Sequence, residues 1–123
     1  MNGMPLGRKT AVPGSYDPGV LYPIPRGGHE AGMHGFDLWR CYELSWLGPK
    51  GRPEAAMLEI AYPLESGNMV ESKSLKLYLG GISNTVFASR GEVAETVTRD
   101  LGKLLEAPWV EVRVLDLSHE WVQ

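Results

Sequence analysis

Apolar and polar residues alternate along two neighbouring stretches of the chain, as they do in strands with one buried face. In the first stretch, one face is expected to carry Leu38, Arg40, Tyr42, Leu44 and Trp46, with the residues between them on the other face. In the second, Ala56, Leu58, Ile60 and Tyr62 share a face, and Pro63 ends the pattern. Because Gly48-Pro49-Lys50-Gly51 favours a turn between them, the two stretches predict an antiparallel hairpin.

Apolar residues then recur at helical spacing. The stripe consists of Val70, Leu75, Leu79 and Ile82, widened by Leu77 and Tyr78. This spacing predicts a helix from about Ser72 to about Ser83, and residues 64–68 before it are expected to form a polar connection. Gly80 and Gly81 weaken the last turn by on the order of 1 kcal/mol each relative to Ala, so the helix is expected to end or bend there.

A capping box, Ser89-Arg90-Gly91-Glu92, predicts the start of a second helix. Its apolar face carries Val93, Val97, Leu101, Leu104 and Leu105, and Pro108 follows its end. Val110, Val112 and Val114 then alternate with charged residues, which predicts a strand from about Trp109 to Leu117. The order strand, strand, helix, helix, strand predicts a two-layer α+β fold with two helices on one face of an antiparallel sheet. One edge of that sheet is left unpaired, which indicates a missing partner.

Glycine and proline are concentrated at the start of the chain. Residues 1–35 hold 8 Gly and 5 Pro, against 7 Gly and 4 Pro in the remaining 88 residues. We therefore expect a Gly/Pro-rich leader and arm over 1–35, a folded module over 36–117 and a tail over 118–123. The leader, residues 1–13, is expected to be poorly ordered and the arm, residues 14–35, irregular, because X-Pro pairs disfavour helix. The arm contains an apolar cluster, Leu21, Tyr22 and Ile24, that requires burial. The arm is therefore expected to pack on the module or on a neighbouring chain.

Length and net charge exclude some classes of protein. A chain of 123 residues fits one domain, and 43% hydrophobic residues suffice for a core. Twelve Lys and Arg against fifteen Asp and Glu give a net charge of −3, which excludes a basic arm for direct binding of nucleic acid. The sequence contains neither an apolar run long enough to span a membrane nor a signal peptide, so we expect no membrane contact and a cytoplasmic location.

Few residues carry catalytic chemistry on their own. Cys41 is a candidate nucleophile, but it lies within the first predicted strand, away from a helix amino terminus that would lower its pKa, and an inert strand cysteine is the simpler interpretation. His29, His34 and His119 show no metal-binding spacing, so no metal site is expected. The sequence also lacks a nucleophile elbow, a P-loop and a dinucleotide fingerprint.

The segment from Val70 to Tyr78 is the densest in chemistry, with Glu71, two serines and two lysines on the first turns of a helix. In one interpretation, Glu71 and Ser72 cap the helix, and Lys73 and Lys76 form a solvated face. In the other, the Glu71 carboxylate accepts two N–H donors from a guanine-like edge, while helix-start amides, a hydroxyl and Lys73 face a phosphate. Spacing alone leaves both interpretations open.

Three runs of sequence resemble one enzyme family. They are Tyr16-Asp17-Pro18 with the run from Leu21 to Arg26, Asp37-Leu38-Trp39 with the run from Tyr42 to Leu47, and above all Glu71-Ser72-Lys73-Ser74-Leu75-Lys76-Leu77-Tyr78-Leu79. Together they are similar to the NADPH-dependent 7-cyano-7-deazaguanine reductases of queuosine biosynthesis, a pathway of tRNA modification. The Glu-Ser-Lys-Ser-x-Lys-x-Tyr block separates these nitrile reductases from the GTP cyclohydrolase I enzymes that share their tunnelling fold (T-fold). The first two runs resemble the amino-terminal half of the two-module form.

The resemblance implies a fold, a reaction and a set of site residues. It implies a tunnelling fold, here expected without its last strand, and reduction of a nitrile to a primary amine by two NADPH through a thioimide on a cysteine, with an aspartate as proton donor. Val70, Glu71 and Ser72 carry over as substrate contacts, and Ser72 and Lys73 as NADPH contacts. No catalytic residue carries over, because the turn from Leu47 to Glu54 lacks the family's Cys-Pro and Gly-Gln-Pro-Asp motifs.

Two hypotheses follow. In the first, the chain is the amino-terminal module of a nitrile reductase and is inactive alone, because a thiol-bearing carboxy-terminal module supplies the catalytic Cys and Asp. The active form is then expected to be a homo-oligomer or a hetero-oligomer with that module. In the second, the fold is retained as a non-catalytic deazapurine-binding, nucleotide-binding or scaffold module. An unrelated enzyme acting through Cys41 is the remaining alternative.

Overall fold

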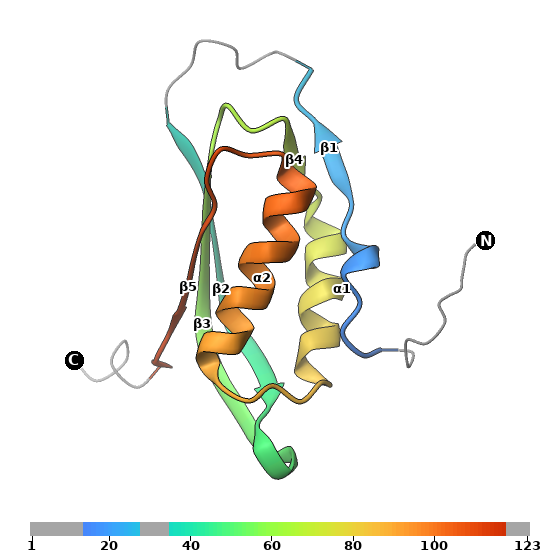
Figure 1. Ribbon diagram of the computed structural model, residues 1–123, viewed down its shortest axis with the longest axis vertical. Coiled ribbons are helices and arrows are strands. Elements are labelled where there is room, and N and C mark those ends of the chain that lie inside the picture. The colour runs from blue at the N-terminus through green and yellow to red at the C-terminus, as the bar shows by residue number, and fades with distance from the viewer. Residues whose placement is uncertain (1–13, 28–34, 118–123) are drawn as a thin grey trace.

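A computed structural model describes residues 14–27 and 35–117 of the chain (Figure 1). The leader over 1–13, the tail over 118–123 and all three histidines, His29, His34 and His119, lie outside the described residues. The described part of the arm contributes to the same core as the module, because Leu21 is 7% exposed and belongs to the buried cluster. Tyr22 remains 64% exposed.

The architecture is α+β in two layers. An antiparallel sheet in the order β2-β3-β5 consists of β2 (Phe36–Leu47), β3 (Pro53–Pro63) and β5 (Glu111–Leu115). Two helices, α1 (Ser72–Ser83) and α2 (Arg90–Leu105), lie on one face of it, with α1 packed against β2 and α2 against β5 (Figure 1). The predicted hairpin, both helices and the third strand are confirmed, although the third strand is shorter than predicted.

A second, smaller sheet was not predicted. It pairs β1 (Pro23–Pro25) of the arm with β4 (Asn68–Val70), antiparallel, directly before α1. Strands of three residues are too short to show an alternating pattern, and β1 begins and ends with proline, which is tolerated only at a sheet edge. The expectation of an irregular arm was therefore wrong at this point, and the polar connection ends one residue earlier than expected.

The alternation in β2 is broken by a β-bulge. The register shifts between Cys41, which pairs with Leu58, and Leu44, which pairs with Ala56. A bulge inserts an extra residue, so the side chains that face the helices change from odd to even positions. The prediction that Leu38 and Leu44 share one face was therefore wrong: Leu38 is 48% exposed, whereas Leu44 is 1% exposed. Trp39 instead lies on the helix side of β2 and packs against the core.

The core fills the space between the helices and the sheet. Its buried side chains are Leu21, Leu44, Trp46, Ala56, Leu58, Ile60, Tyr62, Val70, Leu75, Tyr78, Ile82, Phe87, Val93, Val97, Leu101 and Leu105. The apolar stripes predicted for both helices are confirmed except at Leu77, which is 68% exposed. Leu77 lies two positions from Leu75 and therefore points away from the buried face of α1.

Capping and close packing define the ends of the helices. The Ser89 hydroxyl accepts a hydrogen bond from the Glu92 amide at 3.1 Å, and the Glu92 carboxylate accepts one from the Ala88 amide at 2.6 Å. The capping box is thus confirmed, although the carboxylate reaches one residue further back than expected. The helix α1 does not end at its glycine pair: it continues to Ser83, and a Cβ at Gly81 would collide with the carbonyl of Ser15.

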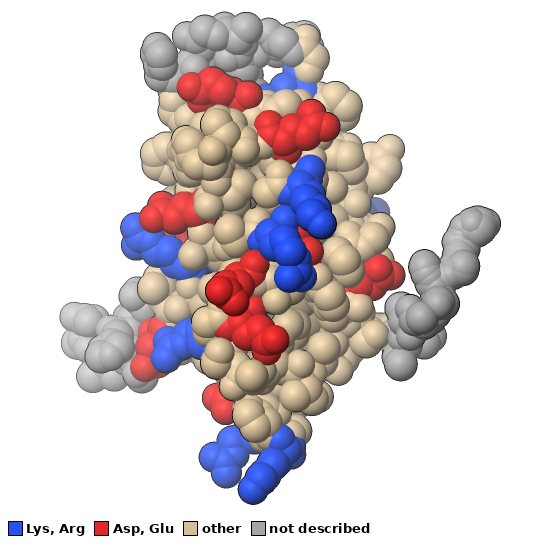
Figure 2. Space-filling model, viewed as in Figure 1, with Lys and Arg blue, Asp and Glu red and all other residues tan. Residues whose placement is uncertain are grey.

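Charges are mixed on the face that the helices cover. Figure 2 shows acidic and basic side chains interspersed there, without a continuous basic patch. This arrangement agrees with the net charge of −3. Within residues 14–27 and 35–117, no helix is long and apolar enough to cross a membrane.

Candidate functional site

The segment that carries the predicted contacts joins β4 to α1. Val70, the last residue of β4, is buried, and its amide donates a hydrogen bond to the Tyr62 hydroxyl at 3.3 Å. Ser72 and Lys73 begin the helix and are exposed. The structure therefore holds one end of this segment in the core and presents the other end to solvent.

Glu71 is the N-cap of α1. One carboxylate oxygen accepts a hydrogen bond from the Ser74 amide at 2.7 Å, and the other accepts one from the Lys73 amide at 3.0 Å. These bonds, that from Ser74 foremost, lower the pKa of Glu71 below its usual value. The capping interpretation is confirmed for Glu71. The expectation that helix-start amides face a phosphate was wrong for Lys73 and Ser74, because Glu71 occupies their amides.

The arm forms hydrogen bonds with the start of α1. The Tyr22 carbonyl accepts a hydrogen bond from the Glu71 amide at 2.9 Å, and the Tyr22 amide donates one to the Ser74 hydroxyl at 2.9 Å. The Ser74 hydroxyl in turn donates to the Glu71 carbonyl at 2.8 Å. The backbone of Glu71 is thus fixed by an element some fifty residues away in sequence, which pre-organises this corner.

Two adjoining pockets lie beside this segment. Pocket A, about 450 Å³, is lined by Ile24, Asp37, Leu38, Trp39, Tyr62, Met69, Val70 and Ser72. Pocket B, about 300 Å³, is lined by Trp39, Ser72, Lys73, Leu75, Lys76 and Leu79. The two predicted groups therefore fall in different pockets: Val70 and Ser72 line pocket A, and Ser72 and Lys73 line pocket B. Glu71 belongs to neither lining.

The two pockets differ in charge. The carboxylate of Asp37 lines pocket A and is held by the buried guanidinium of Arg26, at 3.0 Å. Arg26 also donates to the carbonyls of Ser66 and Pro63, at 3.0 and 3.3 Å. Pocket B instead carries the ammonium groups of Lys73 and Lys76, which are three positions apart on one side of α1. Pocket A thus offers a carboxylate acceptor, and pocket B offers two ammonium donors.

The structure does not bring Cys41 to this site. Cys41 is half-buried in β2, packs against the core and lines neither pocket A nor pocket B. The turn after β2 contains no thiol either, since it reads Gly48-Pro49-Lys50-Gly51-Arg52. Among the described residues, no three His, Cys, Asp or Glu side chains are grouped so as to hold a metal ion.

Comparison with known proteins assigns the family. Residues 12–114 match the family described as nitrile reductase, 7-cyano-7-deazaguanine-reductase N-term. The chain belongs to this family. The match ends within β5 and includes every residue that lines pockets A and B.

Curated relatives of the chain carry names that agree with this family assignment. The proteins of Bordetella pertussis, Bordetella parapertussis and Bordetella bronchiseptica named NADPH-dependent 7-cyano-7-deazaguanine reductase are each 40% identical to the chain over 116 residues. The similarity covers 88% of this chain but 42% of each relative. The chain therefore spans less than half the length of these reductases and corresponds to their amino-terminal region.

Sequence reasoning for this nitrile-reductase module missed three residues of the site. Asp37, Trp39 and Tyr62 line pocket A, yet the alternating pattern identified Trp39 and Tyr62 only as strand residues and did not include Asp37. The pocket forms where β2, β3 and β4 come together, and a local sequence pattern does not predict which strands are neighbours in space. The signal present in the sequence was Asp37-Leu38-Trp39, which carried part of the family resemblance without a stated role.

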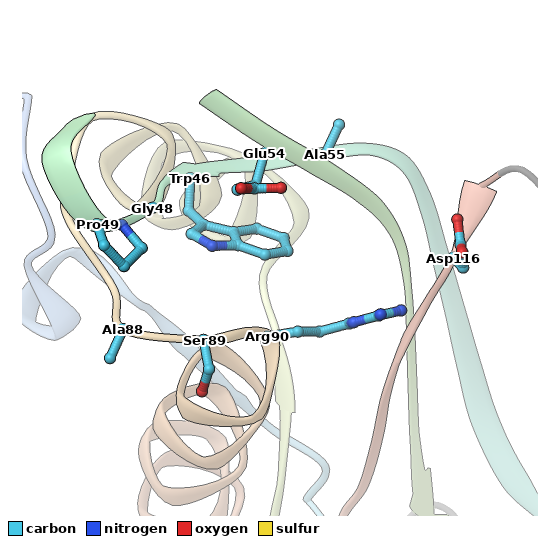
Figure 3. Close-up of a pocket in the computed structure, with 9 residues that line it drawn as sticks. All are labelled: Trp46, Gly48, Pro49, Glu54, Ala55, Ala88, Ser89, Arg90 and Asp116. Carbon is cyan, nitrogen blue, oxygen red and sulfur yellow. The ribbon is translucent and has the colours of Figure 1, made fainter. Parts of the chain in front are cut away.

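A third pocket of this module, pocket C, about 380 Å³, lies at the turn end of the hairpin (Figure 3). Trp46, Glu54 and Ser89 line it, and the Arg90 side chain extends toward the side on which Asp116 follows β5 (Figure 3). None of the predicted site residues lines this pocket. The Ser89 hydroxyl caps α2, which accounts for its position there.

Proposed function

We propose that the chain is the amino-terminal module of an NADPH-dependent nitrile reductase that converts 7-cyano-7-deazaguanine to 7-aminomethyl-7-deazaguanine. One observation carries the proposal: the segment from Val70 to Lys73 lies where pocket A, whose lining includes Asp37, adjoins pocket B, whose lining includes two lysines. A reductase must hold a neutral heterocycle beside a phosphorylated hydride donor, and a largely apolar pocket that adjoins a lysine-lined pocket suits that task. The names of the Bordetella relatives support this assignment.

Val70, Glu71 and Ser72 bind the deazapurine in this proposal. Val70 and Ser72 supply lining to pocket A, whose volume of about 450 Å³ falls in the range of small-molecule sites. Glu71 accepts one backbone N–H on each carboxylate oxygen, and a carboxylate has about four lone-pair positions. The remaining lone pairs can accept the amino and ring N–H groups of the substrate. The cap thus fixes the carboxylate before the ligand binds.

Ser72 and Lys73 hold NADPH in this proposal, with Lys76 beside them. Both lysines line pocket B, and their ammonium groups fit the phosphates of a dinucleotide. NADPH, when bound, supplies the hydride for nitrile reduction. The Lys73 side chain, rather than the first amides of α1, neutralises the phosphate, because Glu71 occupies the amides of Lys73 and Ser74.

The catalytic thiol and acid come from a carboxy-terminal module. The turn after β2 lacks a thiol, Cys41 lies outside both pockets, and the chain covers 42% of the length of its relatives. In the described sheet, β2 and β5 are edge strands. Such edges pair readily with another chain, so we propose that a tunnelling fold closes through them, in a homo-oligomer or in a hetero-oligomer with the thiol-bearing module.

Oxidation of NADPH in the presence of 7-cyano-7-deazaguanine tests this assignment. The chain alone is expected to show none, and addition of the thiol-bearing module is expected to produce it. The Cys41→Ala variant is expected to behave like the wild type in both assays. Activity of the chain alone that disappears in Cys41→Ala would assign the chemistry to Cys41 and overturn the proposal.

A binding or scaffold module of the same fold is the second candidate, favoured by the absence of a thiol from the hairpin turn. It predicts deazapurine binding without NADPH oxidation, even after the thiol-bearing module has been added. A neighbouring reading frame with Cys-Pro and Gly-Gln-Pro-Asp motifs would favour the enzyme over this candidate.

A further inference from the structure

Pockets A and B share two residues, Trp39 and Ser72. Of these two residues, Trp39 has the larger side chain. Trp39 is partly buried and packs against the core from the helix side of β2. A flat aromatic side chain is therefore common to the linings of both pockets.

The position of this indole is fixed. Its N–H donates a hydrogen bond to the Tyr62 hydroxyl at 3.2 Å, and the same hydroxyl accepts a hydrogen bond from the Val70 amide at 3.3 Å. Tyr62 is 1% exposed, and the guanidinium of the buried Arg26 lies 5.8 Å from the centre of its ring. One buried hydroxyl thus ties Trp39 to the first residue of the predicted substrate segment.

We propose that Trp39 is a substrate-binding residue, whose ring forms a stacking surface for a planar bicyclic heterocycle in pocket A, and that Tyr62 is its positioning residue. The inference deepens the proposed function and rests on it. Heterocycles stack on aromatic side chains because both surfaces are flat and polarisable, and the stacking costs no side-chain freedom when the indole is already held. Asp37 in the same lining can accept N–H groups at the edge of the stacked ring.

Titration of the chain with 7-cyano-7-deazaguanine by isothermal calorimetry tests the proposal. Replacement Trp39→Leu is expected to weaken binding by about 10- to 100-fold, the usual range for loss of one stacked aromatic. Trp39→Phe keeps a smaller ring and is expected to lose less than Trp39→Leu. Trp109→Leu is the matched control, because Trp109 is 44% exposed, packs on the Phe36 ring and lines neither pocket. It is expected to bind as the wild type does.

Tyr62→Phe tests the positioning role separately. It retains the buried ring but removes the acceptor of the indole N–H, so Trp39 fluorescence is expected to shift and binding to weaken by less than in Trp39→Leu. Circular dichroism verifies that each variant is folded. Wild-type affinity in folded Trp39→Leu and Trp39→Phe would overturn this inference and leave the proposed function standing. Absence of binding by the wild-type chain would contradict the proposed function, and the inference with it.

Discussion

The hydroxyl of Tyr16 donates a hydrogen bond to the carboxylate of Asp100 at 2.6 Å and so joins the arm to α2. The Tyr78 hydroxyl of α1 donates to the same carboxylate oxygen at 2.7 Å. Asp100 is 8% exposed, so this buried acceptor links three separate parts of the chain. The arm that it anchors is the element that holds the backbone of Glu71 through Tyr22.

Tyr16→Phe is expected to loosen the arm. Loss of a hydrogen bond to a charged group costs about 1.5–3 kcal/mol, and the remaining Tyr78 bond places the loss at the lower end of this range. Amide exchange is expected to accelerate at Tyr22 and Glu71, whose backbone bonds depend on the arm. Hydrogen exchange resolved by residue measures this effect.

Tyr78→Phe is the matched control for that experiment, because it removes the other bond to the same oxygen and leaves the arm attached. It is expected to lower the melting temperature without selective exchange at Tyr22 and Glu71. Equal exchange patterns in the two variants would contradict the role assigned to Tyr16.

The same two tyrosines predict a loss of stability at alkaline pH. Burial, and after it the hydrogen bond to Asp100, raises the pKa of Tyr16 to about 12, and the same causes raise the pKa of Tyr78. A tyrosine in the unfolded chain titrates near pH 10, so deprotonation favours unfolding above that pH. The free energy of unfolding is therefore expected to be constant just below pH 10 and to fall from about pH 10 to 12. Denaturant titrations across this range should show a shallower fall in Tyr16→Phe.

The glycine pair in α1 predicts opposite effects for neighbouring substitutions. A Cβ at Gly80 meets no atom within 4 Å, so Gly80→Ala is expected to stabilise the protein by about 1 kcal/mol through helix propensity. A Cβ at Gly81 collides with the Ser15 carbonyl, so Gly81→Ala is expected to displace the arm and lower the melting temperature. Thermal unfolding of the two variants compares them directly. Stabilisation by both would show that the arm does not pack on α1 as described.

The sequence predicted those features of the fold that have a period or a local signature. The hairpin, both helices and the capping box at Ser89 follow from spacing and from short-range hydrogen bonds, and the structure confirms them. The bulge between Cys41 and Leu44 could not be predicted, because the residues on both sides remain compatible with a strand. Leu77 was misassigned because apolar character alone does not bury a side chain.

Only the part of the candidate site that is formed by consecutive residues could be predicted from the sequence. The segment from Val70 to Lys73 was identified because its residues are consecutive, whereas Asp37, Trp39 and Tyr62 reach pocket A from β2 and β3. Long-range pairing brings these elements together, and periodicity contains no information about it. Spacing alone left both interpretations of Glu71 open, and the structure shows that Glu71 caps α1.

The most direct test of the account is the affinity of the chain for 7-cyano-7-deazaguanine in the Glu71→Gln variant. The amide keeps the size of the side chain but presents a donor to the donors of the substrate, so affinity is expected to fall by about 10- to 100-fold. Glu92→Gln is the matched control, because it weakens the corresponding cap of α2 and lies far along the chain from the segment between Val70 and Lys73. NADPH affinity is expected to change much less in either variant. A lower melting temperature with unchanged deazapurine affinity in Glu71→Gln would reduce Glu71 to a helix cap and contradict the account.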